Sequence, residues 1–359
     1  MGKSHDPLFE ETKRKHPMIG FLVLLLALIL TVVAVLNVIN NSRVNLDKVS
    51  VTVPTLPTAL ESFRILHISD LHGLYFGQRQ EQLKAALASA RYDIVVVTGD
   101  VTGKDGDAGA FLSLIDLIGD SAPLYFIIGD EDPAAILAKP HDTQGPKAAY
   151  ILKAESHGAV YLDAPVRITK GKGTLWLCPE WVYTLDYDAA DAAYQARMKE
   201  LRGQEATPER DAALAAVEYQ ADQLERIRQA RRETLETDVH IAVTHHPLQE
   251  NALKSLRDWT GSENDSYVRA ISLVLAGHYV GGQWRIPGIG AVRVPASSGL
   301  GNNGWFPEDQ KAVGLSTVMG IPQYISPGLG VSAAIGLPAI RIFNTPAVTV
   351  ITLTSKLTQ

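Results

Sequence analysis

Five apolar, β-rich stretches of this 359-residue chain each run into side chains of the types that bind divalent metals. In chain order these side chains are Asp70 and His72, then Asp100, then Asp130 followed by Glu131, then His245, and finally His278. Carboxylate oxygens together with imidazole nitrogens suit ions such as Mn, Fe and Zn, and a bridging carboxylate can hold two ions about 3.5–4 Å apart. Such a pair of ions can activate a water and hold a phosphoryl oxygen, so these residues favour metal-assisted chemistry at phosphorus.

Strands that alternate with helices are expected to position these side chains. The apolar runs before Asp70, Asp100 and Asp130 alternate with amphipathic patterns near residues 78–90 and 108–118. This alternation predicts βαβ units, an α/β fold class and a sheet covered on both faces. Ligands in such folds bind beyond the carboxyl ends of the strands, so we expect the three carboxylates to converge. Glycines directly before Asp100, Asp130 and His278 fit turns in which the backbone approaches a ligand closely.

The ordered motifs resemble those of the calcineurin-like metallophosphoesterases. The matching strings are ILHISDLHG, VVTGD, FIIGDEDP, VTHHP and AGHYVGGQWRIP. The last string and the later SPGLG are similar to the membrane-associated bacterial branch, whose fifth motif reads G-H-T-H-G-G-Q. The resemblance covers about residues 46–354, apart from a helical insertion. It implies a four-layer α/β-β/α metallophosphoesterase sandwich, and an enzyme that uses a metal-bound hydroxide to attack a phosphate ester or pyrophosphate.

The resemblance also implies a metal-ligand role for five side chains. Asp70 and His72 would bind a first metal, Asp100 would bridge, and His245 and His278 would bind a second metal. Asp130 stands where the family has an asparagine ligand, and its carboxylate can still coordinate that second metal. The implied cofactors are two divalent ions of the Mn, Fe or Zn class.

Three positions depart from the family motifs. The family sequence G-N-H-[DE] supplies an asparagine ligand and a catalytic histidine, where this chain has Asp130 and Glu131. The family sequence G-H-x-H supplies a second histidine to the first metal, where this chain has Val280. Mutating a residue that only hydrogen-bonds to a metal ligand typically lowers metal affinity about 10–100-fold, and losing a ligand itself should cost at least as much. The sequence therefore leaves open whether two ions bind or only one binds tightly.

Glu131 is the candidate catalytic residue, because it replaces the family histidine. An ionised Glu131 would repel phosphate, whereas neighbouring carboxylates could raise its pKa enough for it to donate a proton. The alternative function is a catalytically impaired protein that keeps the fold as a binding or scaffold module at the membrane.

Other polar residues near the motifs have structural interpretations. His246, next to Pro247, is expected to support the site or the fold rather than to bind metal, and His67 to be a hydrogen-bonded core residue. Asp132 either orients Glu131 or caps the following turn, and Gln283 either stiffens the glycine loop or does not. The single cysteine, Cys178, is expected in the core.

An uncharged stretch of 19 residues, 18–36, lies near the amino terminus. As a helix it would rise about 28 Å, enough to cross the hydrocarbon core of a bilayer. A cleaved signal peptide is the competing interpretation, but its apolar region is about 7–15 residues long and precedes a small-residue cleavage site, which residues 37–42 lack. Basic residues 13–15 precede the stretch, so the positive-inside rule predicts a single-pass membrane protein with a cytoplasmic amino terminus and an extracytoplasmic main domain.

The chain therefore divides into four parts in this interpretation. They are a cytoplasmic tail (1–16), a transmembrane anchor (17–39), a stalk with an edge strand (40–62), and a metallophosphoesterase-like domain (63–357) with a helical insertion at 187–237. The insertion reads as a helical hairpin that is either a solvated excursion or a contact surface for a protein or the substrate. Prolines and glycines interrupt the apolar region 313–353, which predicts buried strands rather than a second span.

The charge balance bears on the partners. A net charge of −6 gives no nucleic-acid signature, which would be a basic patch or stripe. The expected partners are the membrane and a phosphate-ester substrate, and the anchor makes lipid-linked or envelope-derived phosphates attractive.

Overall fold

The structure is a computed structural model that describes residues 17–137, 146–251, 253–254, 271–296, 300 and 302–356. The expected cytoplasmic tail, residues 1–16, lies outside the described residues, as does residue 357 at the end of the expected main domain.

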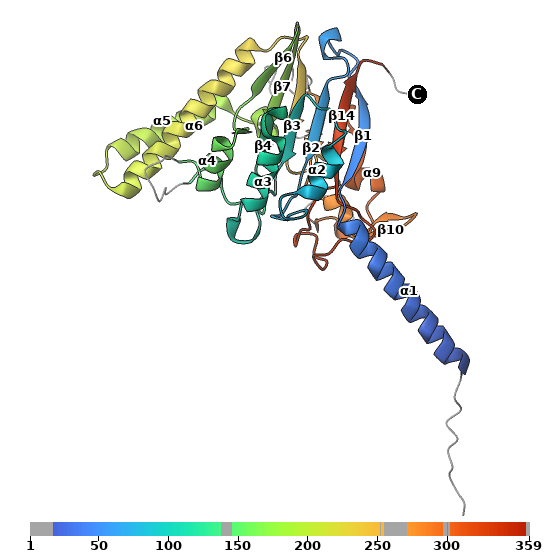
Figure 1. Ribbon diagram of the computed structural model, residues 1–359. Helices are drawn as coiled ribbons and strands as arrows, with labels where there is room; N and C mark the ends of the chain where they lie inside the picture. The colour runs from blue at the N-terminus through green and yellow to red at the C-terminus, as the bar shows by residue number, and fades with distance from the viewer. Residues whose placement is uncertain are drawn as a thin grey trace, which may run out of the picture.

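Two six-stranded sheets form the centre of the described part (Figure 1). The first has the strand order β1-β14-β2-β3-β4-β5, and the second has the order β12-β13-β9-β8-β7-β6. The strands of the first sheet are β1 Asn45–Thr52, β14 Ala347–Thr354, β2 Arg64–Ile68, β3 Ile94–Thr98, β4 Leu124–Ile127 and β5 Ala159–Tyr161. Those of the second are β12 Gly314–Val318, β13 Ile321–Ile325, β9 Ile271–Ala276, β8 Val239–Val243, β7 Gly173–Pro179 and β6 Val166–Lys170.

The strands that precede the acidic motifs run parallel to one another. β2 pairs with β3 and β3 pairs with β4 in parallel. Every residue of β3 is buried, as expected for a strand covered on both faces. Because parallel strands end at the same edge, Asp70, Asp100 and Asp130 all leave the sheet on one side. Strands β8 and β9, which precede His245 and His278, are parallel in the second sheet.

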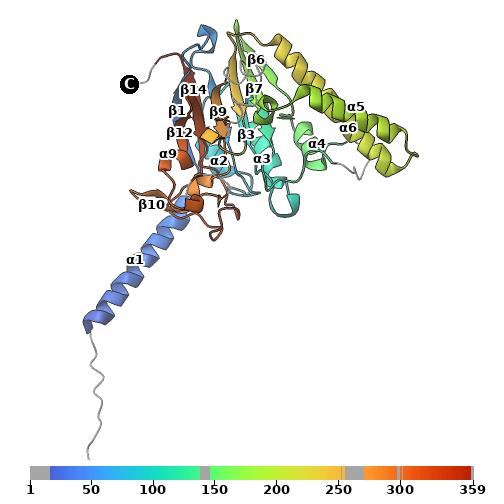
Figure 2. The same ribbon diagram turned by 180° about the vertical axis from the view of Figure 1, so that it is seen from behind.

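Helices and the two sheets make four layers, which confirms the predicted sandwich. The helices α2 Glu81–Leu87, α3 Gly109–Ile118 and α4 Ala149–Ser156 cover the outer face of the first sheet with an apolar core. A second core, which includes Ile65, Val96, Ile241 and Leu275, lies between the two sheets. On the outer face of the second sheet, Cys178 and Trp176 pack with Ile227 of α6. Figure 2 shows this arrangement from behind.

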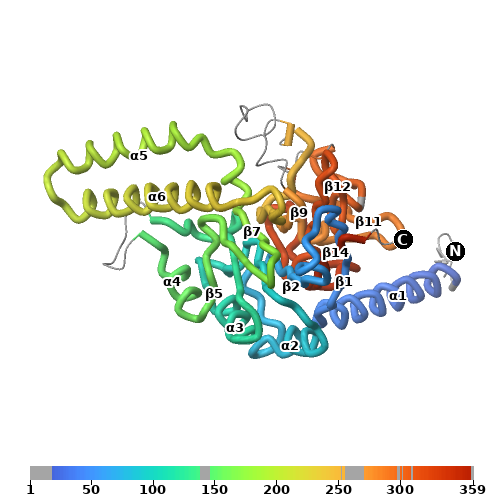
Figure 3. Tube along the Cα trace, turned by 90° about the horizontal axis from the view of Figure 1, so that it is seen from above, coloured from blue at the N-terminus to red at the C-terminus, as the bar shows by residue number. Residues whose placement is uncertain are grey.

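The predicted insertion is a helical hairpin of α5 Tyr187–Arg202 and α6 Pro208–Glu233. The two helices lie side by side and extend beyond the sheets (Figure 3). Asp186 and Thr207 cap them, accepting hydrogen bonds from the backbone of Ala189 and Arg210, and Pro208 occupies the first turn of α6. Of these features, Thr207 followed by Pro208 is recognisable in the sequence as the start of a helix.

Buried Asp163 ties α6 to the loop between β5 and β6. Arg226 donates two hydrogen bonds to its carboxylate, at 2.9 and 3.0 Å, and the Tyr219 hydroxyl donates a third. Gln223 donates to the Asp163 carbonyl at 2.7 Å. The hairpin is thus held to the domain by a polar cluster as well as by apolar packing.

Helix α1, Pro17–Asn41, is the only helix of the described residues that is long and apolar enough to cross a membrane. The carboxyl-terminal end of α1, which we call its exit end, is held by the segment before β14. Asn37 and Asn41 donate to the Arg341 carbonyl at 2.8 and 2.7 Å. The Phe343 amide donates to the Asn37 side chain at 3.0 Å. The chain then enters β1, the expected edge strand, which pairs with β14.

The apolar region 313–353 forms strands and turns, as predicted. It contains β12, β13 and β14, and it follows a short hairpin of β10 Arg285–Ile286 and β11 Gly290–Ala291 and a one-turn helix, α9 Asp309–Ala312.

Candidate metal site

The loops after β2 and β3 interlock at the edge of the first sheet. The amide of Asp70 donates to Gly99, and the amide of His72 donates to Asp100, at 3.0 and 2.9 Å. Asp70, His72 and Asp100 have φ values of 54°, 47° and 52°, which residues other than glycine adopt uncommonly. Such conformations persist where the surroundings over-determine them, and they cluster at functional sites.

All three expected glycines are required by close approach, since a Cβ on Gly99, before Asp100, would overlap the backbone of Gly129. A Cβ on Gly277, before His278, would overlap the Ser69 hydroxyl, and a Cβ on Gly129, before Asp130, would overlap the Asp100 carboxylate. The glycines therefore let loops from the two sheets meet at the Asp70 and Asp100 side chains.

Three groups of ligand-type side chains lie at this junction among the described residues, each with its ligand atoms within 4.8 Å of one another. The groups are Asp70, His72 and Asp100; Asp100, His245 and His278; and Asp130, His246 and His278. Asp100 belongs to the first two groups and His278 to the last two.

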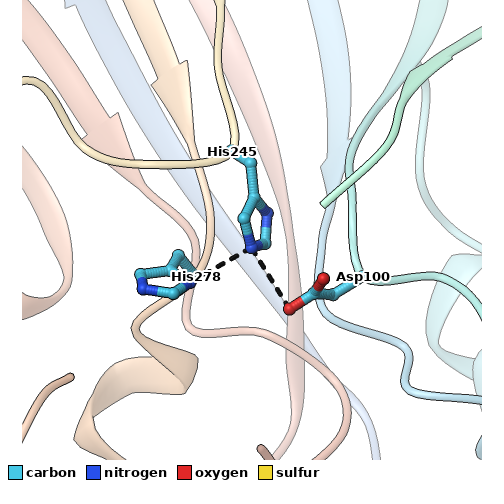
Figure 4. A group of neighbouring side chains, drawn as sticks. All are labelled: Asp100, His245 and His278. Carbon is cyan, nitrogen blue, oxygen red and sulfur yellow. Dashed lines mark hydrogen bonds and ion pairs between the residues drawn. The ribbon is translucent and has the colours of Figure 1, made fainter. Parts of the chain in front are cut away.

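Asp100, His245 and His278 form the most buried group (Figure 4). His245 Nε2 lies 3.1 Å from Asp100 Oδ2 and 3.1 Å from His278 Nδ1. His245 Nδ1 donates to the Thr98 carbonyl at 2.8 Å. A carbonyl can only accept, so Nδ1 carries a proton and Nε2 is the atom presented to the group.

In the group of Asp70, His72 and Asp100, the ligand-type atoms lie farther apart than in the group of Asp100, His245 and His278. His72 Nε2 lies 3.7 Å from Asp100 Oδ2, which is too long for a hydrogen bond. Asp70 accepts a hydrogen bond from the His278 amide at 2.9 Å, which connects the first sheet to the second across the site.

Asp130 meets His246 and His278 rather than the Asp100 and His245 pair. Asp130 Oδ2 lies 2.7 Å from His246 Nε2 and 3.7 Å from His278 Nδ1. Asp70 and Asp100 converge as expected, whereas Asp130 joins them only through His278. From the sequence, His246 was expected to support the site or the fold. In the structure it contacts Asp130 and could itself be a metal ligand, which the sequence interpretation did not predict.

Buried atoms without partners test whether a metal suits these residues. Asp70 Oδ2, His72 Nε2 and His278 Nε2 are buried and make no hydrogen bond in the described part of the chain. Buried polar atoms are nearly always paired, and leaving one unpaired costs about 1–3 kcal/mol. Divalent cations take ligands of these types, so the residues present fit a site for one or two metal ions.

The pKa values of His245 and His278 are shifted in opposite directions. Burial alone would lower the pKa of His245, but its hydrogen bond to Asp100 and the charges of Asp70 and Asp100 raise that pKa to about 9. Burial lowers the pKa of His278 to about 4, and the neighbouring His246 and His245 act in the same direction. Without a cation, the positive charge of the group therefore resides on His245.

The two carboxylates at the centre also differ. Burial raises the pKa of Asp70. Burial acts on Asp100 in the same way, but the hydrogen bond from His245 and the charges of His245 and His72 outweigh it, so the pKa of Asp100 lies below its ordinary value.

Glu131 accepts hydrogen bonds and interacts with His72. Its Oε1 accepts from the Ser332 hydroxyl at 2.5 Å, and its Oε2 lies 3.4 Å from His72 Nδ1. The contact with His72, ahead of the opposing effect of burial, lowers the pKa of Glu131. Glu131 would need a raised pKa to donate a proton. Here His72 and Ser332 stabilise its ionised form, so this environment lowers the pKa instead.

Gln283 extends this network away from Glu131. Its Oε1 accepts from the Ser332 amide at 2.9 Å and its Nε2 donates to the Pro338 carbonyl at 2.7 Å. Gln283 therefore braces the loop that carries Ser332, a residue that no sequence motif marks.

The remaining polar residues have structural roles. Asp132 accepts hydrogen bonds from the amides of Val101, Thr102 and Gly129, so it joins the loops after β3 and β4 instead of orienting Glu131. His67 is fully buried and shares a 2.9 Å hydrogen bond with Thr98, as expected of a core histidine.

Val280 is buried near the Asp70 carboxylate. A Cβ placed on Gly328 would lie 3.2 Å from both Asp70 Oδ2 and the Val280 Cα, so both residues adjoin that glycine. Val280 has a φ of 50°, an outlying conformation for a β-branched residue. It supplies no ligand atom at this position.

A cavity of about 170 Å³ lies beside His245. Glu180, Trp181 and Thr244 are among its lining residues, and burial raises the pKa of Glu180. Glu180 follows β7 in the second sheet, and sequence reasoning missed it because it is not part of a recognisable motif.

A known protein family and two solved structures are similar to this chain. A family model described as calcineurin-like phosphoesterase matches residues 63–281. The crystal structure of phosphopantetheinyl hydrolase (PptH) from Mycobacterium tuberculosis is similar at 15% identity and a TM-score of 0.34, covering 74% of this chain and 89% of that one. The Thermus thermophilus sulfate thiohydrolase SoxB in complex with glycerol is 11% identical with a TM-score of 0.34, covering 84% of this chain and 58% of that one. Among curated proteins, no sequence matches.

Proposed function

Because this chain belongs to the calcineurin-like phosphoesterase family, we propose that it is a membrane-anchored, metal-dependent phosphoesterase that hydrolyses a phosphate ester or pyrophosphate. The observation that carries the proposal is Asp100, which is shared by two ligand-type groups, each with a buried histidine nitrogen, His72 Nε2 or His278 Nε2, that makes no hydrogen bond among the described residues. Divalent ions bound there would supply an activated water and neutralise phosphate charge.

The proposed ligands act in two sets. Asp70 and His72 would hold one ion, His245 and His278 would hold the other, and Asp100 belongs to both groups. Asp130 reaches the second set through His278. The Thr98 carbonyl fixes the ring of His245, so the more buried set is pre-organised and is proposed to bind its ion more tightly.

Glu131 is proposed to position the ring of His72 rather than to donate a proton to the substrate. Its carboxylate is held by Ser332 and contacts His72 Nδ1, which leaves His72 Nε2 directed at Asp100. Carboxylates that contact the second nitrogen of a ligating histidine orient its ring and raise its basicity.

The location proposed for this activity is outside the cytoplasm. Helix α1 supplies the anchor, and the basic residues 13–15 before it favour a cytoplasmic amino terminus. A lipid-linked or envelope-derived phosphate is the substrate class that this location favours.

A second candidate function is a binding or scaffold module with impaired catalysis. Val280 favours it, because a buried valine stands where the family has a ligand and cannot coordinate an ion. Glu131 favours it too, since its lowered pKa places a negative charge where phosphate would approach.

Metal content and turnover of the full chain test the proposal. Purified protein in detergent is loaded with Mn²⁺, its metal is counted, and hydrolysis of bis(p-nitrophenyl) phosphate is followed. We expect metal-dependent turnover that Asp100→Asn lowers by at least about 100-fold, because the bridge between two ions is lost. Asp116→Asn on α3, a carboxylate 61% exposed and outside the site, is the matched control and should leave turnover unchanged.

The result that overturns the enzyme is metal binding without turnover under Mn²⁺, Fe²⁺ and Zn²⁺ alike. That outcome would leave the binding module as the function.

A further inference from the structure

Large apolar side chains are exposed on the loops beside the exit end of α1. Among the described residues they are Ile286, Ile289, Trp305, Phe306, Ile340 and Phe343, with exposed fractions between 37% and 63%. We call these six residues the apolar rim. Single exposed apolar residues are ordinary, whereas a contiguous group marks an interaction surface.

Hydrogen bonds show that the apolar rim is one connected structure. The Trp284 indole donates to the Ile340 carbonyl at 3.0 Å, and the Arg285 amide donates to Ile342 at 2.9 Å. Val292 donates to Trp284 at 2.8 Å, and Phe306 donates to Val292 at 2.9 Å. The β10–β11 hairpin, the 305–306 turn and the 340–343 segment are therefore mutually braced.

The same structure holds α1. Phe343 and Arg341 bond to Asn37, and Arg341 also bonds to Asn41, in the last turns of the helix. In two opposite views, β10 and the loops before β14 lie at the end of α1 that meets the domain (Figures 1 and 2). The apolar rim thus surrounds the point where a membrane-spanning helix would leave the bilayer.

The chemistry of the apolar rim matches a lipid interface. Trp and other amphipathic aromatic residues are enriched at the headgroup level, and apolar side chains next to them insert into the boundary with the acyl chains. The Arg293 guanidinium lies 4.9 Å from the Trp305 ring centroid, which places a cation beside an aromatic ring, as suits a surface near lipid phosphates.

We propose that the apolar rim is a second membrane contact, seated in the headgroup region of the bilayer that α1 enters. This inference rests on α1 being the retained anchor of the proposed function. The bilayer is the occupant, rather than a second copy or another protein, because the rim is continuous with the helix that would cross it.

This contact would place the candidate metal site near the membrane. Arg341 donates to the carbonyls of Gly330 and Pro327 at 2.7 and 2.8 Å, and the Gly330 amide donates to the Asp70 carbonyl at 2.5 Å. Hydrogen bonds through Arg341 and Gly330 therefore connect the α1 contact to a proposed metal ligand. The loops that carry the ligands and the loops that carry the rim leave the sheets at the same end of the molecule (Figure 1).

Single-cysteine labelling of the full chain tests the contact without any metal or substrate. Cys178 is fully buried, so Ile289→Cys, Phe306→Cys and Phe343→Cys each add an accessible thiol for an environment-sensitive fluorophore. Leu235→Cys is the matched control, because Leu235 is an apolar residue that is 61% exposed in the connection between α6 and β8 and is not part of the apolar rim. Each labelled protein is reconstituted into phosphatidylcholine vesicles that contain a nitroxide lipid.

We expect the lipid nitroxide to quench labels at the three rim positions at least threefold more than the label at position 235, and aqueous iodide to show the reverse order. Equal lipid quenching at all four positions would overturn the proposal. Rim labels shielded from both quenchers, with energy transfer between two copies, would overturn it in favour of a dimer contact. Since the readout needs no turnover, its failure is distinguishable from failure of the phosphoesterase.

Discussion

Ser332 donates its hydroxyl proton to Glu131 Oε1 over 2.5 Å, which joins the loop before β14 to the loop after β4. The other oxygen of Glu131 faces His72, so Ser332 acts on a proposed metal ligand through one intermediate side chain.

Ser332→Ala is expected to weaken Mn²⁺ binding about 10-fold, because residues behind ligands typically contribute that much to metal affinity. Calorimetric titration of the full chain measures it. Ser156→Ala on α4, whose hydroxyl bonds only the Lys153 carbonyl in the same helix, is the control. Equal affinity in both variants would show that Ser332 does not orient the site.

Val280→His is expected to add a metal ligand. Histidine is several-fold enriched in left-handed backbone conformations, whereas valine is an outlier there, so the φ of 50° at this position tolerates the change. Metal analysis should show the stoichiometry rise toward two ions, with the weaker ion bound at least about 10-fold more tightly. Val280→Ala, which removes volume without adding a ligand, should show no such gain. A loss of metal in Val280→His would mean that valine belongs to a rebuilt, working site.

His278→Ala and His246→Ala separate the two groups that share His278. His278 belongs to both, whereas His246 belongs only to the more exposed group with Asp130. We expect metal affinity to fall more than about 100-fold in His278→Ala and by no more than about 10-fold in His246→Ala. Isothermal titration with Mn²⁺ ranks them, and the reverse order would place the tighter ion at Asp130.

Asp163 is expected to make stability depend on pH. Burial would raise its pKa, but hydrogen bonds from Arg226 and Tyr219 outweigh burial and hold that pKa below its ordinary value. A lowered pKa in the folded state contributes stability above about pH 4, and that contribution is lost as pH falls through the folded-state pKa. Asp163→Asn should therefore lower the free energy of unfolding by about 1–3 kcal/mol at pH 7 and by less near pH 3.

Denaturant unfolding at both pH values checks this expectation. The matched control is Asp222→Asn, which removes an exposed carboxylate bonded to the same Arg226 and should cost less than about 1 kcal/mol. A constant difference between Asp163→Asn and the unsubstituted chain across this pH range would contradict the argument.

The sequence predicted the ligand-type residues of the first sheet because each follows a short apolar run. Asp70 and Asp100 stand two residues after parallel, neighbouring strands, and two such strands bring their ends together without further information. The alternation of strand and helix was likewise enough for the α/β class, and helical apolar spacing with Thr207 and Pro208 at the start of the second helix was enough for the hairpin.

The contacts that sequence could not predict come from irregular loops. His246 meets Asp130 because two loops from different sheets cross, and no periodicity encodes that crossing. Ser332 lies in a segment rich in glycine and proline whose backbone has no repeating pattern, so its bond to Glu131 appears only in three dimensions. The same reasoning explains why the pKa of Glu131 could not be assigned a direction beforehand.

The position of β14 has a consequence for the order of assembly. It lies between β1 and β2, and it is the last strand of the described chain to be synthesised. The segment just before it supplies Gly328, Gly330, Ser332 and Arg341, which pack or bond around Asp70 and Glu131. Strand β2 can pair with β3 at once, but β1 must wait for β14, which follows roughly 300 residues later, and pairing over such separations is slow. The proposed metal site would therefore be completed only after this last segment has been synthesised.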